Sequence, residues 1–420
     1  MGGRRRGPPR PRVRQLRGGA TEEIARLVRD EGTRVLATLI RVTGDVDLAE
    51  DAVQDAVVRA LERWPTEGLP PSPGGWLLVT AKRRAVDLIR REARRAGKEA
   101  AAMLALDPGP EPDDVVRDDL LRLVFTCCHP TLAVEAQVAL ALRTLAGLST
   151  AEVARALLVP EATMAKRLTR AKQKIAQAGI PYRVPAAEDL PGRLRGVAAT
   201  IYLIFNEGYA AGAGADVLRV ALTGEAVRLA RLLAELMPDE ATVSGLLALL
   251  LLQDARRAAR VDAAGLPVLL ADQDRSRWDG AAIREGVELV GAALRRGPDR
   301  PDAYVVQAAI AACHDLAPTY AATPWDAIVS WYDVLLSVQD QEVVRLNRAA
   351  AVAERDGPAA GLALVDAIAG LDGYPWWHAS RAELLHRLGH TGEAHAAYAR
   401  AVGAGMSGPQ AELLRRRVGA

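Results

Sequence analysis

The feature that most constrains this chain is the helical spacing of its apolar residues, which recurs nearly everywhere from Thr21 onward. No alternating apolar pattern is long enough to predict a sheet, so we expect an all-α fold. Three Pro- and Gly-rich stretches interrupt the helical pattern, at residues 64–75, 107–114 and 180–191. We predict a loop for the first stretch and domain boundaries for the other two.

The charge of the chain is unevenly distributed along its length. Residues 1–185 hold 31 Lys and Arg against 23 Asp and Glu, a balance of +8. Residues 186–420 hold 23 against 29, a balance of −6. We therefore expect the front of the chain, and not the back, to meet a polyanion.

Composition argues against a secreted or membrane protein, and we expect a cytoplasmic one. Three cysteines cannot form a disulfide framework. The longest apolar run, 245–252, is far shorter than the ~20 residues that cross a bilayer. Residues 1–19 contain seven Arg, three Pro and no acid, and show no signal-peptide pattern. They predict a disordered basic tail, either inert or binding polyanions nonspecifically.

Residues 149–175 predict a helix-turn-helix. Ser149 and Glu152 have the spacing of a capping box, which begins one helix, and Pro160 suits the start of the next. The second helix has an apolar back and a basic front, the form that a major groove accepts. The candidate DNA contacts on that front are Thr163, Lys166, Arg167 and Arg170. A solvated basic face on an ordinary surface helix is the alternative.

Two further helices carry concentrated charge. Residues 47–61 form an acidic helix whose polar side holds Asp47, Glu50, Asp51, Gln54 and Asp55. Clustered acids repel one another, so this side needs a basic partner, unless it is simply solvated. Residues 75–95 form a basic helix suited to phosphate contact, with Trp76 as a core residue or a stacking platform. Its candidate DNA contacts are Lys82, Arg83, Arg84, Arg90 and Arg91.

These three motifs in this order resemble an RNA polymerase sigma factor of the extracytoplasmic-function class. DLAEDAVQDA resembles the region 2 helix that binds the polymerase β′ clamp, and GWLLVTAKRRAVDLIRR the segment that melts and reads the −10 element. LSTAEVARALLVPEATMAKRLTRAKQKI resembles the region 4 helix-turn-helix that reads the −35 element. Arg83 departs from the Asn that family members often carry, which affects the −10 preference. The resemblance implies that core polymerase, through its β′ clamp and β flap, and promoter DNA are the partners.

The back of the chain resembles the subgroup that bears a long tetratricopeptide-like extension, through FTCCHP, LIFNEGY and a repeat. Residues 357–368 and 391–402 align at an offset of 34 residues, and 301–339 form a further, degenerate pair. We predict that this part regulates the sigma factor or recruits a protein partner.

The predicted domain organisation follows from these motifs and boundaries. In chain order we expect a basic tail at 1–19, region 2 at 20–95, a linker at 96–114, region 4 at 115–180, a linker at 181–191, a helical extension at 192–300 and tetratricopeptide-like repeats at 301–420.

We expect no bond chemistry, cofactor or metal. Cys127 and Cys128 are interpreted as a buried structural pair, with redox sensing as the alternative. The charged segment DQDRSRW, with the arginines upstream of it, is interpreted as a buried ion-pair network. Glu207, His314 and His378 show no triad or metal spacing. Two other functions stay open: a repressor with a ligand-sensing C-terminal domain, and an enzyme targeted to DNA, built around Glu207, Asp254 or Asp272.

Overall fold

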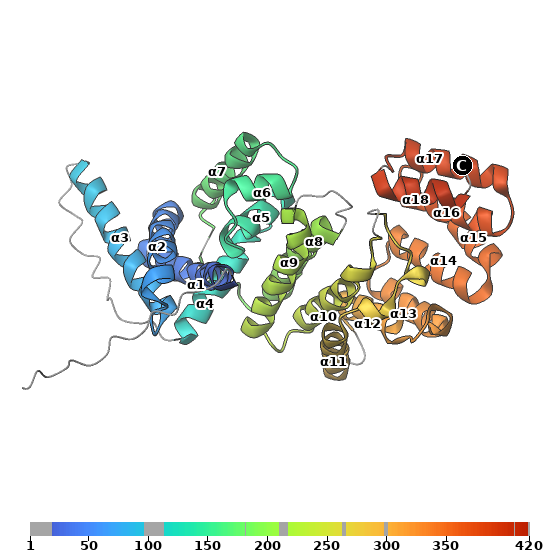
Figure 1. Ribbon diagram of the computed structural model, residues 1–420, viewed down its shortest axis with the longest axis horizontal. Coiled ribbons are helices and arrows are strands. Elements are labelled where there is room, and N and C mark those ends of the chain that lie inside the picture. The colour runs from blue at the N-terminus through green and yellow to red at the C-terminus, as the bar shows by residue number, and fades with distance from the viewer. Residues whose placement is uncertain are drawn as a thin grey trace, which may run out of the picture. The chain divides into compact units, whose positions relative to one another are not determined.

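The computed structural model is all-α, as the sequence predicts. It describes residues 19–95, 113–180, 182–209, 217–262, 266–297, 301–406 and 408–418. Over these ranges it has eighteen α-helices and, apart from one isolated bridge between Val261 and Pro267, no β-structure (Figure 1). No helix among the described residues has both the length and the apolar character to cross a membrane. Most of the predicted tail and the linker residues 96–112 lie outside the described residues.

The described chain forms two compact units. The first takes the described residues up to Val153 and from Pro160 to Arg193, and the second takes those from Leu194 onward with the short stretch Ala154–Val159. The helices before the unit boundary are α1 (Gly19–Thr43), α2 (Val46–Glu67), α3 (Pro73–Arg95), α4 (Asp113–Cys127), α5 (Val134–Leu140), α6 (Thr150–Ala156) and α7 (Glu161–Gln177).

In the first unit, α1 packs against α2, α3 and α4. A turn at Gly44 separates α1 from α2, and Gly44 has the positive φ of 70° that such a turn requires. The predicted loop at 64–75 is shorter than expected, because α2 continues to Glu67. Trp64 is buried and meets Trp76 edge to face, with ring centroids 5.5 Å apart, so the last turn of α2 belongs to the core.

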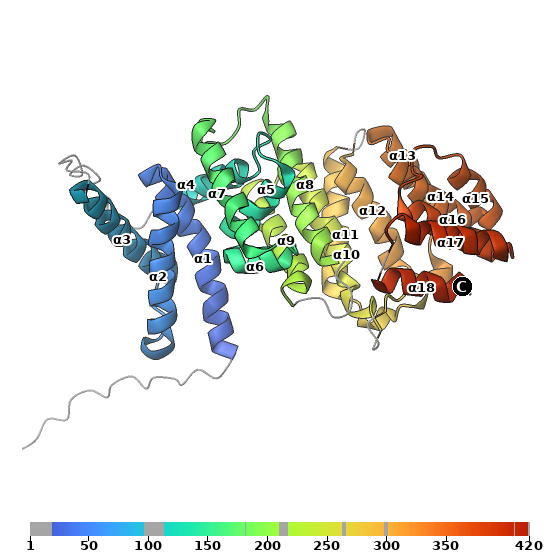
Figure 2. The ribbon, with the colours of Figure 1, turned by 90° about the horizontal axis from the view of Figure 1, so that it is seen from above.

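The second unit is built from consecutive helices, of which α10 is almost entirely buried. Its helices are α8 (Leu190–Tyr209), α9 (Val217–Leu236), α10 (Ala241–Ala255), α11 (Gly280–Arg296), α12 (Ala303–Leu316), α13 (Trp325–Val338), α14 (Glu342–Asp356), α15 (Pro358–Asp366), α16 (Pro375–Arg387), α17 (Thr391–Gly403) and α18 (Gly408–Val418). Figure 2 shows α10, α11 and α12 side by side. Gly245 lets α10 and α12 approach, since a Cβ there would lie 2.5 Å from the Val305 amide nitrogen.

The repeat predicted at the C-terminal end corresponds to helix pairs. The aligned residues 357–368 and 391–402 coincide with α15 and α17, which pack against α14 and α16 respectively. Small residues bring these helices together, as the fully buried Ala382, Ala394 and Ala397 show. The predicted pair at 301–339 is also present, as α12 and α13.

One part of the second unit differs from the helical pattern that we expected. Between α10 and α11 the chain runs through residues 256–279 with three short 3-10 turns and the single bridge, as far as it is described. Pro267 cannot donate a helical hydrogen bond. Asp279 then begins α11 by accepting from the amides of Ala281 and Ala282 at 2.9 and 3.1 Å.

Candidate nucleic-acid and polymerase interfaces

Helix α2 carries the acidic side that the sequence predicted. Asp45 caps its N-terminus by accepting from the Leu48 amide at 3.0 Å. The apolar side is buried through Ala49, Val53, Ala56 and Ala60. Of the five predicted polymerase contacts, Asp47, Asp51 and Gln54 are exposed and Asp55 is half-buried. Glu50 is only 8% exposed, so it does not belong to an open surface.

Glu50 is buried because basic residues from the region 4 side of the unit cover it. The Lys172 ammonium, from α7, donates to Glu50 Oε2 at 3.0 Å and to Asp47 Oδ1 at 2.7 Å. Arg143, in a single π-turn at Ala141–Leu145, lies 3.4 Å from the same Glu50 oxygen. The basic partner that the acidic side needs is therefore supplied by the chain itself at Asp47 and Glu50.

The electrostatics of Lys172 match this placement. Burial by itself lowers the pKa of a lysine, because it disfavours the charged form. The nearby Glu50 charge and the hydrogen bonds to Asp47 and Glu50 outweigh burial and raise the pKa of Lys172 above its ordinary value. The ammonium therefore stays charged at neutral pH and holds two carboxylates together that would otherwise repel each other.

Further contacts fix α1 to the segments that follow the linker. Thr33 donates from its hydroxyl to the Leu145 carbonyl at 3.2 Å. Arg41 donates to the fully buried Asp119 at 2.8 Å. Burial raises the pKa of Asp119 despite the arginines beside it. The Tyr182 hydroxyl lies 2.9 Å from the carbonyl oxygens of both Ala37 and Asp119. These bonds hold the two sigma-like regions in one compact unit.

A cavity of about 430 Å³ lies beside the Lys172 contact. Val28, Leu36 and Val53 line its apolar part, and Gln54 and Arg143 its polar part. Gln54 therefore faces this hollow between α1, α2 and the π-turn. Asp51 is exposed and has no ion pair among the described residues.

The basic helix α3 presents part of its predicted DNA face. Arg83, Arg90 and Arg91 are exposed. Arg84 instead forms an ion pair with Asp55 of α2, so a predicted DNA contact and a predicted polymerase contact neutralise each other. Lys82 is only 4% exposed, because it lies on the side of α3 that joins the core, so it is not part of the exposed basic surface in this structure and its contact with DNA stays a prediction.

The helix-turn-helix has the local structure that the sequence predicted. Ser149 and Glu152 form the reciprocal capping box, with bonds of 2.7 and 3.2 Å. Leu158 adopts a left-handed φ of 53° in the turn between α6 and α7. Met164, Leu168 and Ala171 form the buried back of α7. The predicted DNA contacts Thr163, Lys166 and Arg170 are exposed and Arg167 is half-buried.

The buried ion-pair network interpreted from the sequence around Trp278 is present only in part, because it involves Arg256 and Arg275 but not the acids of the segment. Arg256 lies 3.5 Å from Asp315, whose pKa burial raises to about 7. Arg275 stacks on Trp278, 4.3 Å from the ring centroid, and donates to the carbonyls of His314 and Ala317 at 2.8 Å. Burial lowers the pKa of His314 to about 4. Asp272 and Asp274 are exposed and lie outside this network.

Cys127 and Cys128 are buried free thiols, in agreement with the structural interpretation. Burial raises the pKa of Cys127 well above its ordinary value, so the thiolate is disfavoured. Within the described ranges no group of three or more His, Cys, Asp or Glu side chains could hold a metal ion.

Comparisons with known proteins agree with the motifs. Residues 27–95 match the family model for sigma-70 region 2, and residues 122–175 match that for sigma-70 region 4. Residues 193–294 match a family of unknown function, DUF6596. Neither sigma-70 family is a family of enzymes.

Several relatives cover either the front of the chain or nearly all of it. The ECF RNA polymerase sigma factor SigK of Mycolicibacterium vanbaalenii is 30% identical over 162 residues, covering 37% of this chain and 81% of the relative. SigL of Mycobacterium tuberculosis, also an ECF RNA polymerase sigma factor, is 30% identical over 37% of this chain and 89% of its own. An uncharacterized protein of Rhizobium meliloti is 42% identical over 92% of both chains.

The Lys172 contact makes a prediction about stability. Lys172→Ala leaves Glu50 buried with Arg143 as its remaining partner, and we expect it to lower the free energy of unfolding of the first unit by about 1–3 kcal/mol. Lys166→Ala removes the same charge from an exposed position on the same helix and should cost less than about 0.5 kcal/mol. Urea unfolding of the full chain, monitored by hydrogen exchange of the α2 amides, measures the change in the free energy of unfolding for both substitutions. Equal effects of the two substitutions would contradict the assigned role of Lys172.

Proposed function

The chain belongs to the extracytoplasmic-function class of RNA polymerase sigma factors, and on this basis we propose how its parts divide the work of transcription initiation. As a sigma factor it binds core RNA polymerase and promoter DNA and promotes initiation. In our proposal α2 contacts the β′ clamp, α3 the −10 element and α7 the −35 element, while region 4 also meets the β flap. The observation that carries the promoter assignment is α7, whose back is buried and whose front is basic and exposed.

The −10 contacts in this proposal are the exposed arginines of α3, namely Arg83, Arg90 and Arg91. Arg84 joins them only when its ion pair with Asp55 opens. Their charge suits phosphate contact, which positions the protein on the duplex without reading sequence. The −35 contacts are Thr163, Lys166, Arg167 and Arg170, of which the arginines can bond guanine edges bidentately.

Polymerase binding by α2 requires a rearrangement in this proposal. Asp51 and Gln54 are exposed, but Lys172 holds Asp47 and covers Glu50. A basic partner on the clamp therefore competes with Lys172 for the same carboxylates. The chain then exists as a closed form with α7 against α2 and an open form competent for polymerase, and the apparent affinity scales with the open fraction.

The second unit regulates the sigma regions from within the same chain in our proposal. Residues 186–420 carry a balance of −6 against the +8 of residues 1–185, and both stretches belong to one chain. Two parts joined by a short covalent connection have an effective concentration on the order of millimolar, so even a weak intrinsic interaction becomes populated. The arrangement is compatible with inhibition or with activation.

The promoter assignment is tested with Arg167→Ala and Arg170→Ala in the full chain. Each should cost about 1–3 kcal/mol in promoter binding by the holoenzyme, and a base contact should relax preference at one position of the −35 element. Gln173→Ala, at an exposed neutral position on the same helix, should leave binding unchanged. Run-off transcription on promoter variants measures the effect, and unaltered −35 discrimination in both arginine variants would overturn the placement of α7.

The polymerase assignment is tested by two substitutions with opposite expected effects. Asp51→Arg should weaken association with core polymerase at least about tenfold without changing stability, since the side chain is exposed and has no ion pair. Lys172→Ala should strengthen association several-fold, because it raises the open fraction. Glu62→Arg, which reverses an exposed acid further along α2, is the matched control. Titration of the labelled chain with core polymerase measures the affinity of each variant. Equal affinities of Asp51→Arg and Glu62→Arg would contradict the clamp assignment.

Control by the second unit is tested with a chain that ends at Arg193, which keeps the first unit nearly complete, including the Arg193 bond to the Phe125 carbonyl at 2.6 Å. We expect its run-off output with core polymerase to differ several-fold from that of the full chain, with no other factor added. Equal output from the two chains would show instead that the second unit is a recruitment platform.

A further inference from the structure

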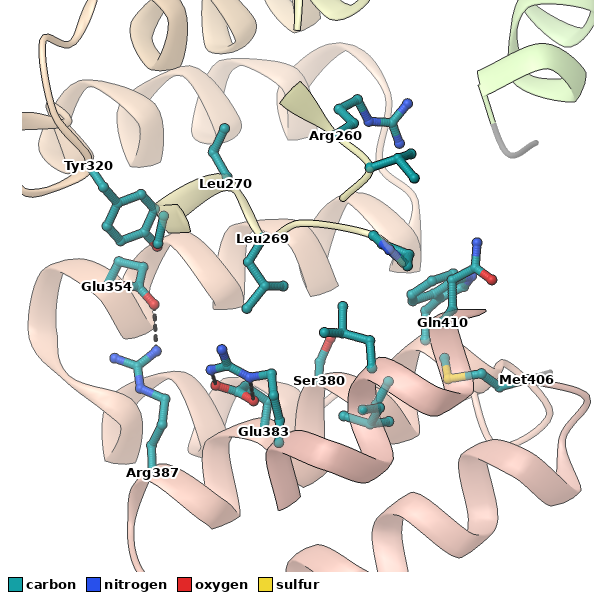
Figure 3. Close-up of a pocket in the computed structure, with 18 of the residues that line it drawn as sticks. Arg260, Leu269, Leu270, Tyr320, Glu354, Ser380, Glu383, Arg387, Met406 and Gln410 are labelled. Carbon is teal, nitrogen blue, oxygen red and sulfur yellow. Dashed lines mark hydrogen bonds and ion pairs between the residues drawn. The ribbon is translucent and has the colours of Figure 1, made fainter. Parts of the chain in front are cut away.

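The second compact unit contains a pocket of about 890 Å³, large enough for a small organic molecule. Figure 3 shows its two sides. One side is the non-helical segment between α10 and α11, and the other consists of helices α14, α16 and α18. Both sides are mainly apolar. The apolar lining includes Val261, Pro267, Leu269, Trp376, Met406 and Leu413.

The charged groups at one end of the pocket already have partners. Arg387 donates to Glu354 at 2.5 Å, and Arg417 donates to Glu383 at 2.9 Å through its Nε. Tyr320 lies beside the first pair (Figure 3), and burial and the Glu354 charge raise its pKa to about 12. This end therefore presents neutralised pairs and a protonated phenol.

The other end contains a guanidinium that lacks a carboxylate. Arg260 lines the pocket there, half-buried, and donates to the Tyr209 carbonyl at 3.2 Å. It also lies over the Tyr209 ring, 3.3 Å from the centroid. Within the described ranges no acid forms an ion pair with it. Burial lowers the pKa of this guanidinium.

The neighbouring arginines show that this lack is specific to Arg260. Arg257 holds Asp254 with two bonds of 2.7 and 2.6 Å, and Arg256 pairs with Asp315. The nearby acids are therefore already engaged. A half-buried cation with no counterion is costly, and an anion that forms two parallel hydrogen bonds with a guanidinium compensates the cost well.

We infer that this pocket binds an amphipathic small organic acid, with its carboxylate on Arg260 and its apolar body between the Leu269 side and the Trp376 side. Net charge supports an anion, because the two ion pairs cancel and leave Arg260 in excess. The apolar walls disfavour an extended peptide, whose main chain needs polar side chains along the groove. Besides tyrosines, the lining offers Ser380 and Gln410 as neutral hydrogen-bonding side chains.

The inference is tested by direct binding to the full chain without polymerase, so the result does not depend on the proposed regulation. The probes are two acids, dodecanoate and naphthoate, and dodecanol as the uncharged analogue. Calorimetry measures the binding of each probe at concentrations below its micelle concentration. We expect at least one acid to bind with one molecule per chain and dodecanol to bind about tenfold or more weakly.

Three variants locate the site. Arg260→Gln should weaken the acid about tenfold or more, and Arg260→Lys should restore part of the affinity by keeping the charge. Ser380→Trp, which fills the pocket from α16 without removing an apolar contact, should abolish binding. Arg277→Gln is the control, since Arg277 is exposed in the same segment and does not line the pocket. Circular dichroism of each variant confirms folding.

Several outcomes would overturn the assignment. Failure of both acids to bind the full chain excludes this ligand class. Equal affinity for dodecanoate and dodecanol removes the role of Arg260 as an anion site. Undiminished binding to folded Ser380→Trp places the ligand elsewhere. Tighter binding of a peptide with a free C-terminal carboxylate than of either acid would make the pocket a protein-docking site instead.

Discussion

The organisation of the first unit depends on one lysine that lies between two carboxylates. Lys172 joins α7, which carries the basic face proposed to read the promoter, to the Asp47 and Glu50 side of α2. The contact joins residues 122 positions apart in the sequence and so brings α7 against α2. It therefore determines which surfaces of these two helices are exposed together. The exposed basic front of α7 and the exposed Asp51 stay available in this arrangement, whereas Glu50 does not.

The local structure of the front was predictable because its signals are local. A capping box at Ser149 and Glu152, an apolar back and a basic front specify α7 within a few turns. The burial of Lys82 and Glu50 was not predictable, since a helical wheel gives the side of a helix but not what covers it. The partners of Glu50 come from α7 and the π-turn, and no short pattern in the sequence connects them with α2.

In the second unit, too, the features with a local sequence signal were predictable and those set by tertiary packing were not. The 34-residue offset identified the helix pairs, because small residues recur where two helices approach closely. The non-helical segment at 256–279 differs from the helical expectation, because Pro267 breaks the helical pattern while the charges around it give no signal of their own for a loop. Only the three-dimensional structure shows which arginine has no acidic partner. Arg256 and Arg257 form ion pairs with the nearby carboxylates, and Arg260 lines the pocket without one.

The contact that covers Glu50 is better suited to a reversible switch than to a permanent connection between α2 and α7. The desolvation free energy of a carboxylate and an ammonium offsets much of their electrostatic attraction, so a half-buried ion pair adds little net stability. Breaking it is unfavourable only while the carboxylate stays buried without a partner. A polymerase surface that supplies a new cation as Lys172 leaves replaces the lost interaction directly, so the closed form can protect the acidic side against weak partners and still open for the right one. Since Asp51 is exposed in this structure, the proposed first contact with the β′ clamp can form before Lys172 leaves.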